Sequence, residues 1–94
     1  MKKINETINL KELEKYGYEK YNAYYVKYTN DTYRGAKIAI CINLFTRYIE
    51  KHYCWTYMFG PVLHTIITRN NKPVNVDKKY IQDLIQAGYV EEVA

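Results

Sequence analysis

The strongest constraint on the fold is an alternation of side chains with a period of two. In residues 36–43, Ile38, Ile40 and Ile42 alternate with small or charged residues. Successive side chains of an extended strand point to opposite faces, so the three isoleucines share one face. The pattern predicts a strand that places this face in the hydrophobic core.

Three further segments have the aromatic and β-branched composition of strands: Asn22–Thr29, Tyr48–Phe59 and Val62–Thr68. The second of them fits one long twisted strand or two shorter ones. Asn30-Asp31 is predicted to form the turn after the first, Gly60-Pro61 to break the ladder, and residues 69–73 to form a polar turn. With Ala36–Asn43 these segments predict a four-stranded antiparallel β-meander.

Two helices are predicted to flank the sheet. Asn9 and Glu12 resemble a capping box and Gly17 a helix stop, which predicts a short helix near Leu10–Tyr16. At the other end, Asn75 or Asp77 caps a helix over Asp77–Ala87 that ends at Gly88.

The apolar face of the C-terminal helix, formed by Ile81, Leu84 and Ile85, is expected to cover the isoleucine face of the sheet. Val90 and Val93 then add a short extended tail against the sheet. The expected fold class is α+β, in a single domain of residues 1–94. The longest apolar runs are too short to span a bilayer and no leader pattern follows Met1, so we expect a soluble protein of the cytoplasm.

The chain is basic, with a net charge of +4 and a pI near 9.0. Residues 29–76 carry six Lys and Arg against two Asp and Glu. This balance favours acidic partners. The basic residues are spread along the segment as on an ordinary solvated surface, however, and do not form the stripe that is typical of nucleic-acid domains.

Glu50, His52 and Cys54 project from one face of a strand and formally resemble an acid, base and nucleophile. Same-face neighbours on a strand lie roughly 6.5–7 Å apart at Cβ, which we judge too far for easy hydrogen bonding. We therefore predict no catalytic residues.

A zinc site would need three or four ligands from Cys41, His52, Cys54, His64 and a carboxylate to converge. A hairpin about Phe45 places Cys41 opposite Glu50 and away from Cys54. Both cysteines are therefore expected to be reduced thiols, and no metal or cofactor is predicted.

The chain holds twelve tyrosines but two phenylalanines and one tryptophan, a balance that favours half-exposed strands and a contact surface. Leu44 and Phe45 stand at an expected turn, where they are either buried under a helix or presented to a partner. The predicted partner-binding residues are Leu44, Phe45, Tyr24, Tyr25, Tyr28, Tyr33, Arg34, Lys37 and Arg47.

Three parts of the chain resemble short proteins encoded by phages and prophages of low-GC Gram-positive bacteria. They are residues 10–21 (LKELEKYGYEKY), residues 39–43 (AICIN) with 47–50 (RYIE), and residues 83–93 (DLIQAGYVEEV). Some proteins of this kind act as anti-CRISPR or other anti-defence inhibitors, so the resemblance implies a binder encoded by a mobile element. Many such inhibitors are acidic mimics of DNA, a mode that the basic pI argues against.

The expected function is that of a non-enzymatic phage or prophage accessory protein, which docks on a host protein such as a CRISPR effector and inhibits it. The alternative is a small basic protein that binds single-stranded nucleic acid by tyrosine stacking. A third interpretation is self-association, for example as a homodimer. No membrane partner is expected.

Overall fold

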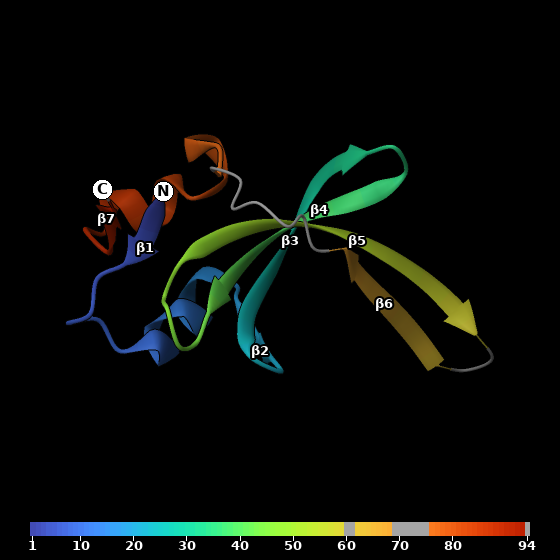
Figure 1. Cartoon of the computed structure of the whole chain (residues 1–94), viewed down its shortest axis with the longest axis horizontal. Coiled ribbons are helices and arrows are strands. Elements are labelled where there is room, and N and C mark those ends of the chain that lie inside the picture. Colours follow the sequence, from blue (N-terminus) through green and yellow to red (C-terminus); the bar gives the residue numbers. More distant parts are fainter. Residues whose placement is uncertain (60–61, 69–75, 94) are drawn as a thin grey trace.

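The computed structural model describes the backbone of residues 1–59, 62–68 and 76–93, and the side chains of residues 1–54 and 76–93. These residues form an α+β fold built on an antiparallel sheet (Figure 1). Its strands follow one another in chain order: β2 (Glu19–Tyr21), β3 (Tyr24–Tyr33), β4 (Ala36–Asn43), β5 (Ile49–Phe59) and β6 (Val62–Thr68). A second sheet pairs β1 (Lys2–Ile4) with β7 (Val90–Glu92).

Strands β3 to β6 confirm the predicted antiparallel meander, with residues 49–59 forming one long strand. The predicted turn at Asn30-Asp31 is wrong, because β3 continues to Tyr33 and its register shifts between Tyr28 and Thr32. The Thr29 hydroxyl donates to the Ile38 carbonyl oxygen at 2.7 Å and stabilises this bulge.

The chain reverses instead at Arg34-Gly35, where both residues have positive φ, as a tight hairpin turn requires. The edge strand β2 was not predicted. The predicted break at Gly60-Pro61 and the predicted turn at residues 69–73 lie outside the described residues.

The predicted N-terminal helix is present at Leu10–Tyr16 as the 3-10 helix η1. The Asn9 side chain accepts the Lys11 N–H, and Gly17 has the left-handed φ of 90° that a helix stop requires. The predicted C-terminal helix lies where it was expected, but it is not continuous. The helix is divided into η2 (Lys78–Tyr80) and α1 (Gln82–Gln86), because Ile81 leaves helical geometry at φ −124°.

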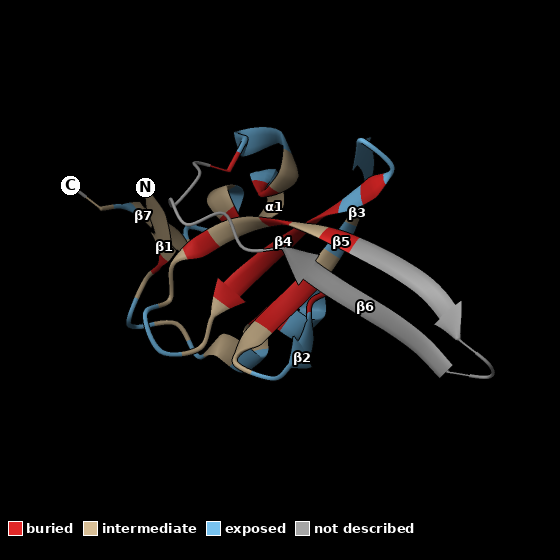
Figure 2. Cartoon of the chain, turned by 45° about the vertical axis from the view of Figure 1, so that its right-hand side comes forward, coloured by how far each residue is buried: buried red, intermediate tan, exposed pale blue. Residues whose placement is uncertain are grey.

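The helices gather at one end of the sheet, next to the β1–β7 pair (Figure 1). Their apolar side chains meet one face of β3, β4 and β5 in a single cluster of buried residues: Ile4, Leu13, Tyr18, Tyr25, Ile40, Ile42, Ile49, Val76, Ile81 and Leu84. Figure 2 shows the buried strand β4 with α1 above it. The predicted packing of the C-terminal helix on the isoleucine face is present in part: Ile81 and Leu84 join Ile40 and Ile42 in the cluster, whereas Ile38 lies outside it. The predicted extended tail is present as β7, but it pairs with β1.

Among the described residues, no helix combines the length and the apolar character needed to cross a membrane.

Leu84 is fully buried in the core cluster, and its replacement by Ala should leave a cavity between α1 and the sheet. We expect Leu84→Ala to lower the free energy of unfolding by about 2–5 kcal/mol. Urea denaturation followed by circular dichroism measures this loss. Gln86→Ala, at an exposed position of the same helix, is the control and should change stability by less than about 0.5 kcal/mol. A loss below about 1 kcal/mol for Leu84→Ala would contradict the packing.

Candidate functional site

The sheet face opposite the helices carries the predicted Glu50, His52 and Cys54 array. It holds a second buried cluster made of Val26, Ala39, Cys41 and Cys54, with Tyr24 packed against it. The rings of Tyr24 and His52 meet edge to face, with their centroids 5.4 Å apart. Tyr24 lies on β3 and His52 on β5, so their rings meet across the intervening strand β4. The small side chains of Ala39 and Cys41 leave room for this contact.

Glu50 and His52 are hydrogen bonded, with 3.0 Å between Glu50 Oε1 and His52 Nε2. The expectation that same-face neighbours lie too far apart to bond is wrong for this pair, because both side chains are long enough to span the gap. His52 is 4% exposed, and its Nδ1 has no hydrogen-bond partner within the part of the chain that the structure describes. The pair is thus fixed on the sheet, with a polar atom buried beside it.

Cys41 lies opposite Glu50 in the β4–β5 register, as predicted, and both cysteines are buried free thiols. Burial raises the pKa of the Cys41 thiol, and the nearby Cys54 and Glu50 raise it further. Burial also raises the pKa of Cys54. Because the thiolate is the nucleophile and the metal ligand, raised pKa values disfavour both chemistries at neutral pH.

Among the residues that the structure describes, no three His, Cys, Asp or Glu side chains are placed to hold a metal ion. The side chain of His64, one of the candidate ligands, lies outside the described set.

The buried thiols should react slowly with a thiol reagent at neutral pH. We expect the native protein to react at least about tenfold more slowly than the urea-unfolded chain, since both access and the thiolate fraction are lower in the fold. The reaction is followed by the absorbance change of Ellman's reagent. A native rate equal to the unfolded rate would show that the thiols are accessible and activated.

The β4–β5 turn resolves the two alternatives for Leu44 and Phe45. Leu44 packs against the core cluster, whereas Phe45 is 85% exposed. The turn is held by Asn43, whose side-chain oxygen accepts the N–H groups of Phe45 at 2.8 Å and Thr46 at 3.0 Å. The Arg47 N–H in turn donates to the Asn43 carbonyl oxygen at 2.9 Å. A large apolar ring is therefore presented on an ordered turn.

Arg47, a predicted contact residue, is used within the fold. Its guanidinium donates to the carbonyl oxygens of Asn5 at 2.9 Å and Ile8 at 2.6 Å. Its backbone has a left-handed φ of 64°. The Leu44 N–H also bonds to the Ala23 carbonyl oxygen at 2.9 Å and ties the β2–β3 turn to the same place. Arg47 thus braces the turn that carries Phe45.

The predicted tyrosines of the first strand divide between the two faces. Tyr25 belongs to the core cluster under the helices, and Tyr24 lies on the opposite face against His52. Tyr28 and Tyr33 are each 47% exposed. Lys37 is exposed and pairs with Cys54 in the β4–β5 register, so it lies on the face away from the helices. The predicted set is therefore not one surface.

A cluster of aromatic and basic side chains lies on the core face of the sheet, on β3, on β5 and at the Arg34-Gly35 turn. The Tyr33 and Tyr53 rings are 5.1 Å apart at their centroids. The Arg34 guanidinium lies 5.2 Å from the Tyr33 centroid, and Lys51 Nζ lies 5.8 Å from that of Tyr53. We call these four residues the tyrosine-cation cluster.

Lys51 and Tyr53 were missed in the sequence analysis. The alternation itself could have found them, because the register places Tyr33 opposite Ala36 and Tyr53 opposite Ile38 on one face.

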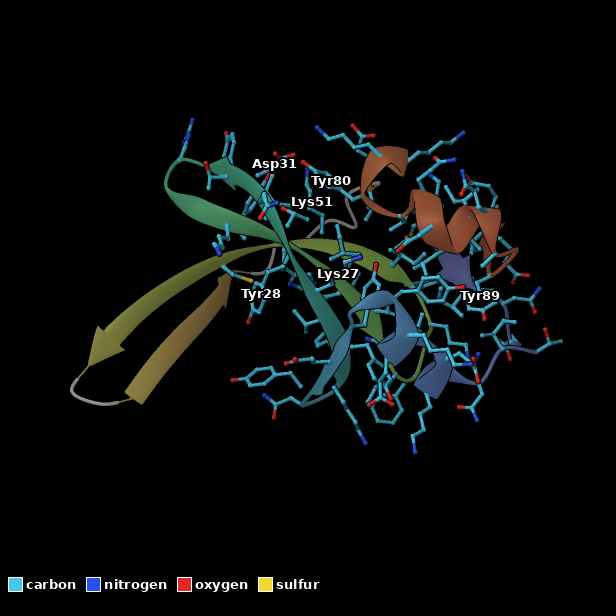
Figure 3. All side chains as sticks on the ribbon, turned by 180° about the vertical axis from the view of Figure 1, so that it is seen from behind. Lys27, Tyr28, Asp31, Lys51, Tyr80 and Tyr89 are labelled. Atoms are coloured by element: carbon cyan, nitrogen blue, oxygen red, sulfur yellow. The ribbon has the colours of Figure 1, made fainter. Side chains whose placement is uncertain are left out.

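Asp31, in the β3 bulge, anchors the strand to η2. The Tyr80 hydroxyl donates to Asp31 Oδ2 at 2.5 Å (Figure 3). Lys79 Nζ lies 3.4 Å from the same oxygen. The Tyr80 hydrogen bond, followed by that from Lys79, lowers the pKa of Asp31.

The lowered pKa of Asp31 implies a pH dependence of stability. The ionised carboxylate stabilises the fold above its ordinary pKa of 3.8, and this contribution is lost as pH falls through the lower folded pKa. An NMR titration of the Asp31 carboxyl carbon should give a pKa below 3.8. Tyr80→Phe should raise this pKa, and an unchanged value would show that the hydroxyl does not bond to Asp31 in solution.

Comparison of the chain with models of protein families, with curated proteins and with solved structures finds no match.

Proposed function

We propose that this protein is a non-enzymatic docking module that binds a host protein through the β4–β5 turn and inhibits it. The observation that carries the proposal is Phe45, an 85% exposed aromatic side chain on a turn held by side-chain hydrogen bonds. An apolar ring in water is unfavourable, and its burial in a partner's pocket is a source of binding free energy.

The order of the turn supports the same function. Asn43 fixes the backbone at Phe45 and Thr46, while Arg47 ties the turn to the N-terminal segment. A side chain on a preorganised turn loses little conformational entropy on binding. Aromatic anchors of this kind commonly dominate the affinity of protein interfaces.

The raised pKa values of Cys41 and Cys54 favour binding over catalysis as the mode of action. The Glu50–His52 pair, in which the histidine is buried, acts in this proposal as packing that stiffens the sheet. The class of target, a bacterial defence effector such as a CRISPR effector, rests on the resemblance to phage and prophage proteins.

The proposal is tested in bacteria whose CRISPR system restricts a phage. Expression of the wild-type protein should raise the phage titre, and Phe45→Ala should lower that titre by more than about tenfold. Removal of a central interface anchor costs more than about 2 kcal/mol, or about 30-fold in Kd. Calorimetry with the purified effector should show that loss and a fixed stoichiometry, because a docking inhibitor acts by occupancy.

Thr46→Ala is the matched control, because Thr46 is exposed on the same turn. It should leave both the titre and the Kd within about threefold of wild type. No effect of the wild-type protein on the titre would reject the defence effector as the target. Equal binding by Phe45→Ala and wild type would reject the turn as the docking surface.

A further inference from the structure

Most carboxylates of the chain have hydrogen-bond or ion-pair partners within the fold. All ten Asp and Glu residues lie within the described range. Several of them form ion pairs at the end of the sheet that the helices cover. Glu92, Glu91, Glu12 and Asp83 pair there with Lys2, Lys3, Lys15 and Lys27. Asp31, in the β3 bulge, is bonded to Tyr80 and Lys79 of η2. The carboxylates are thus largely committed to internal partners.

Arg34 and Lys51 form no ion pair with the described residues. Residues 55–75 contain Arg69 and Lys72 but no Asp or Glu. That segment therefore has no acidic side chain that could pair with Arg34 or Lys51. The two cations rest instead on the Tyr33 and Tyr53 rings. Among the described residues, neither cation is therefore neutralised by an ion pair.

The same place offers an aromatic surface. Tyr33 is 47% exposed, and its ring leans on Tyr53 at an interplanar angle of 31°. Arg34, at the exposed Arg34-Gly35 turn, covers the Tyr33 ring with a planar guanidinium. Nucleic-acid bases stack both on tyrosine rings and on guanidinium planes. The four residues combine a stacking platform with charges that suit phosphate.

We propose that the tyrosine-cation cluster is a binding site for single-stranded nucleic acid, separate from the Phe45 turn. Arg34 and Lys51 contact backbone phosphates, and an unpaired base stacks on Tyr33 or on the Arg34 guanidinium. A duplex keeps its bases inside its own stack, and an acidic protein has no bases to place on the rings. Single strands are the partner class that uses both the charge and the aromatic surface.

The probe is a fluorescein-labelled 20-nucleotide oligo(dT), and its binding to the whole protein is measured by fluorescence anisotropy from 50 to 200 mM salt. The test variant combines Arg34→Asn with Lys51→Gln; Asn tolerates the positive φ of residue 34. We expect at least about a tenfold loss of affinity and a salt slope smaller by about 1.4, at about 0.7 for each lost phosphate contact.

The matched control is Lys20→Gln, an exposed lysine on β2 opposite Tyr25, at the other end of β3. It loses one charge like each test substitution and should stay within about twofold of wild type. Tyr33→Leu should weaken binding about fivefold or more with an unchanged salt slope, because stacking and not charge is removed. Phe45→Ala should have no effect. Circular dichroism confirms that each variant is folded.

Three results would overturn the proposal. No binding of oligo(dT) at 50 mM salt would remove the site, and an equal loss in Lys20→Gln and the test variant would indicate non-specific attraction. In competition with the labelled probe, a duplex of the same length or polyglutamate should be weaker than unlabelled oligo(dT). Equal competition would assign the surface to another class of partner. If Tyr33→Leu does not fold, the proposal is judged by the Arg34→Asn/Lys51→Gln variant and by the competition experiment.

Discussion

The burial of β4 on both of its faces is the constraint on which the rest of the structure depends. One face carries the large side chains of Ile40 and Ile42, which pack against the helices. The other carries Ala39 and Cys41, and is small enough that Tyr24 and His52 meet across it. The strand therefore sets the thickness of both layers. A bulky residue at position 39 or 41 would separate the two rings and strain the sheet.

The unequal cover of the sheet determines where the two proposed binding surfaces lie. The helices and the β1–β7 pair occupy one end of the sheet (Figure 1). Exposed aromatic side chains remain on strands β2 and β3 and on the β4–β5 turn: Tyr21, Tyr28, Tyr33 and Phe45. Phe45 stands on a turn at the covered end, braced by Arg47, while Tyr33 and Arg34 stand at the hairpin beyond the helices. Two surfaces of different chemistry are thus separated by the length of β3 and β4.

The sequence predicted the parts of the fold that depend on local pattern. The period-two alternation located β3 to β6, and the residues flanking Leu10–Tyr16 located η1. Features set by tertiary contacts were missed. The bulge at Asn30-Asp31 is accompanied by hydrogen bonds of Thr29 and Tyr80, and the last helix is divided at Ile81, a fully buried residue. The interior role of Arg47 follows from two distant carbonyl groups that no local pattern reveals.

The pairing of β1 with β7 has a consequence for how the chain folds. Lys2 lies opposite Glu92, and the Val93 N–H bonds to the Met1 carbonyl oxygen at 2.7 Å, so this ladder joins residues about ninety positions apart. Closing such a loop costs chain entropy that local hairpins avoid. Strand β1 also meets the meander directly, through the Lys3–Tyr48 bridge and the Ile4 N–H, which donates to the Arg47 carbonyl oxygen at 2.9 Å. The β1–β7 ladder itself can close only after β7 has been synthesised, so we expect this ladder to be among the last parts of the fold to form.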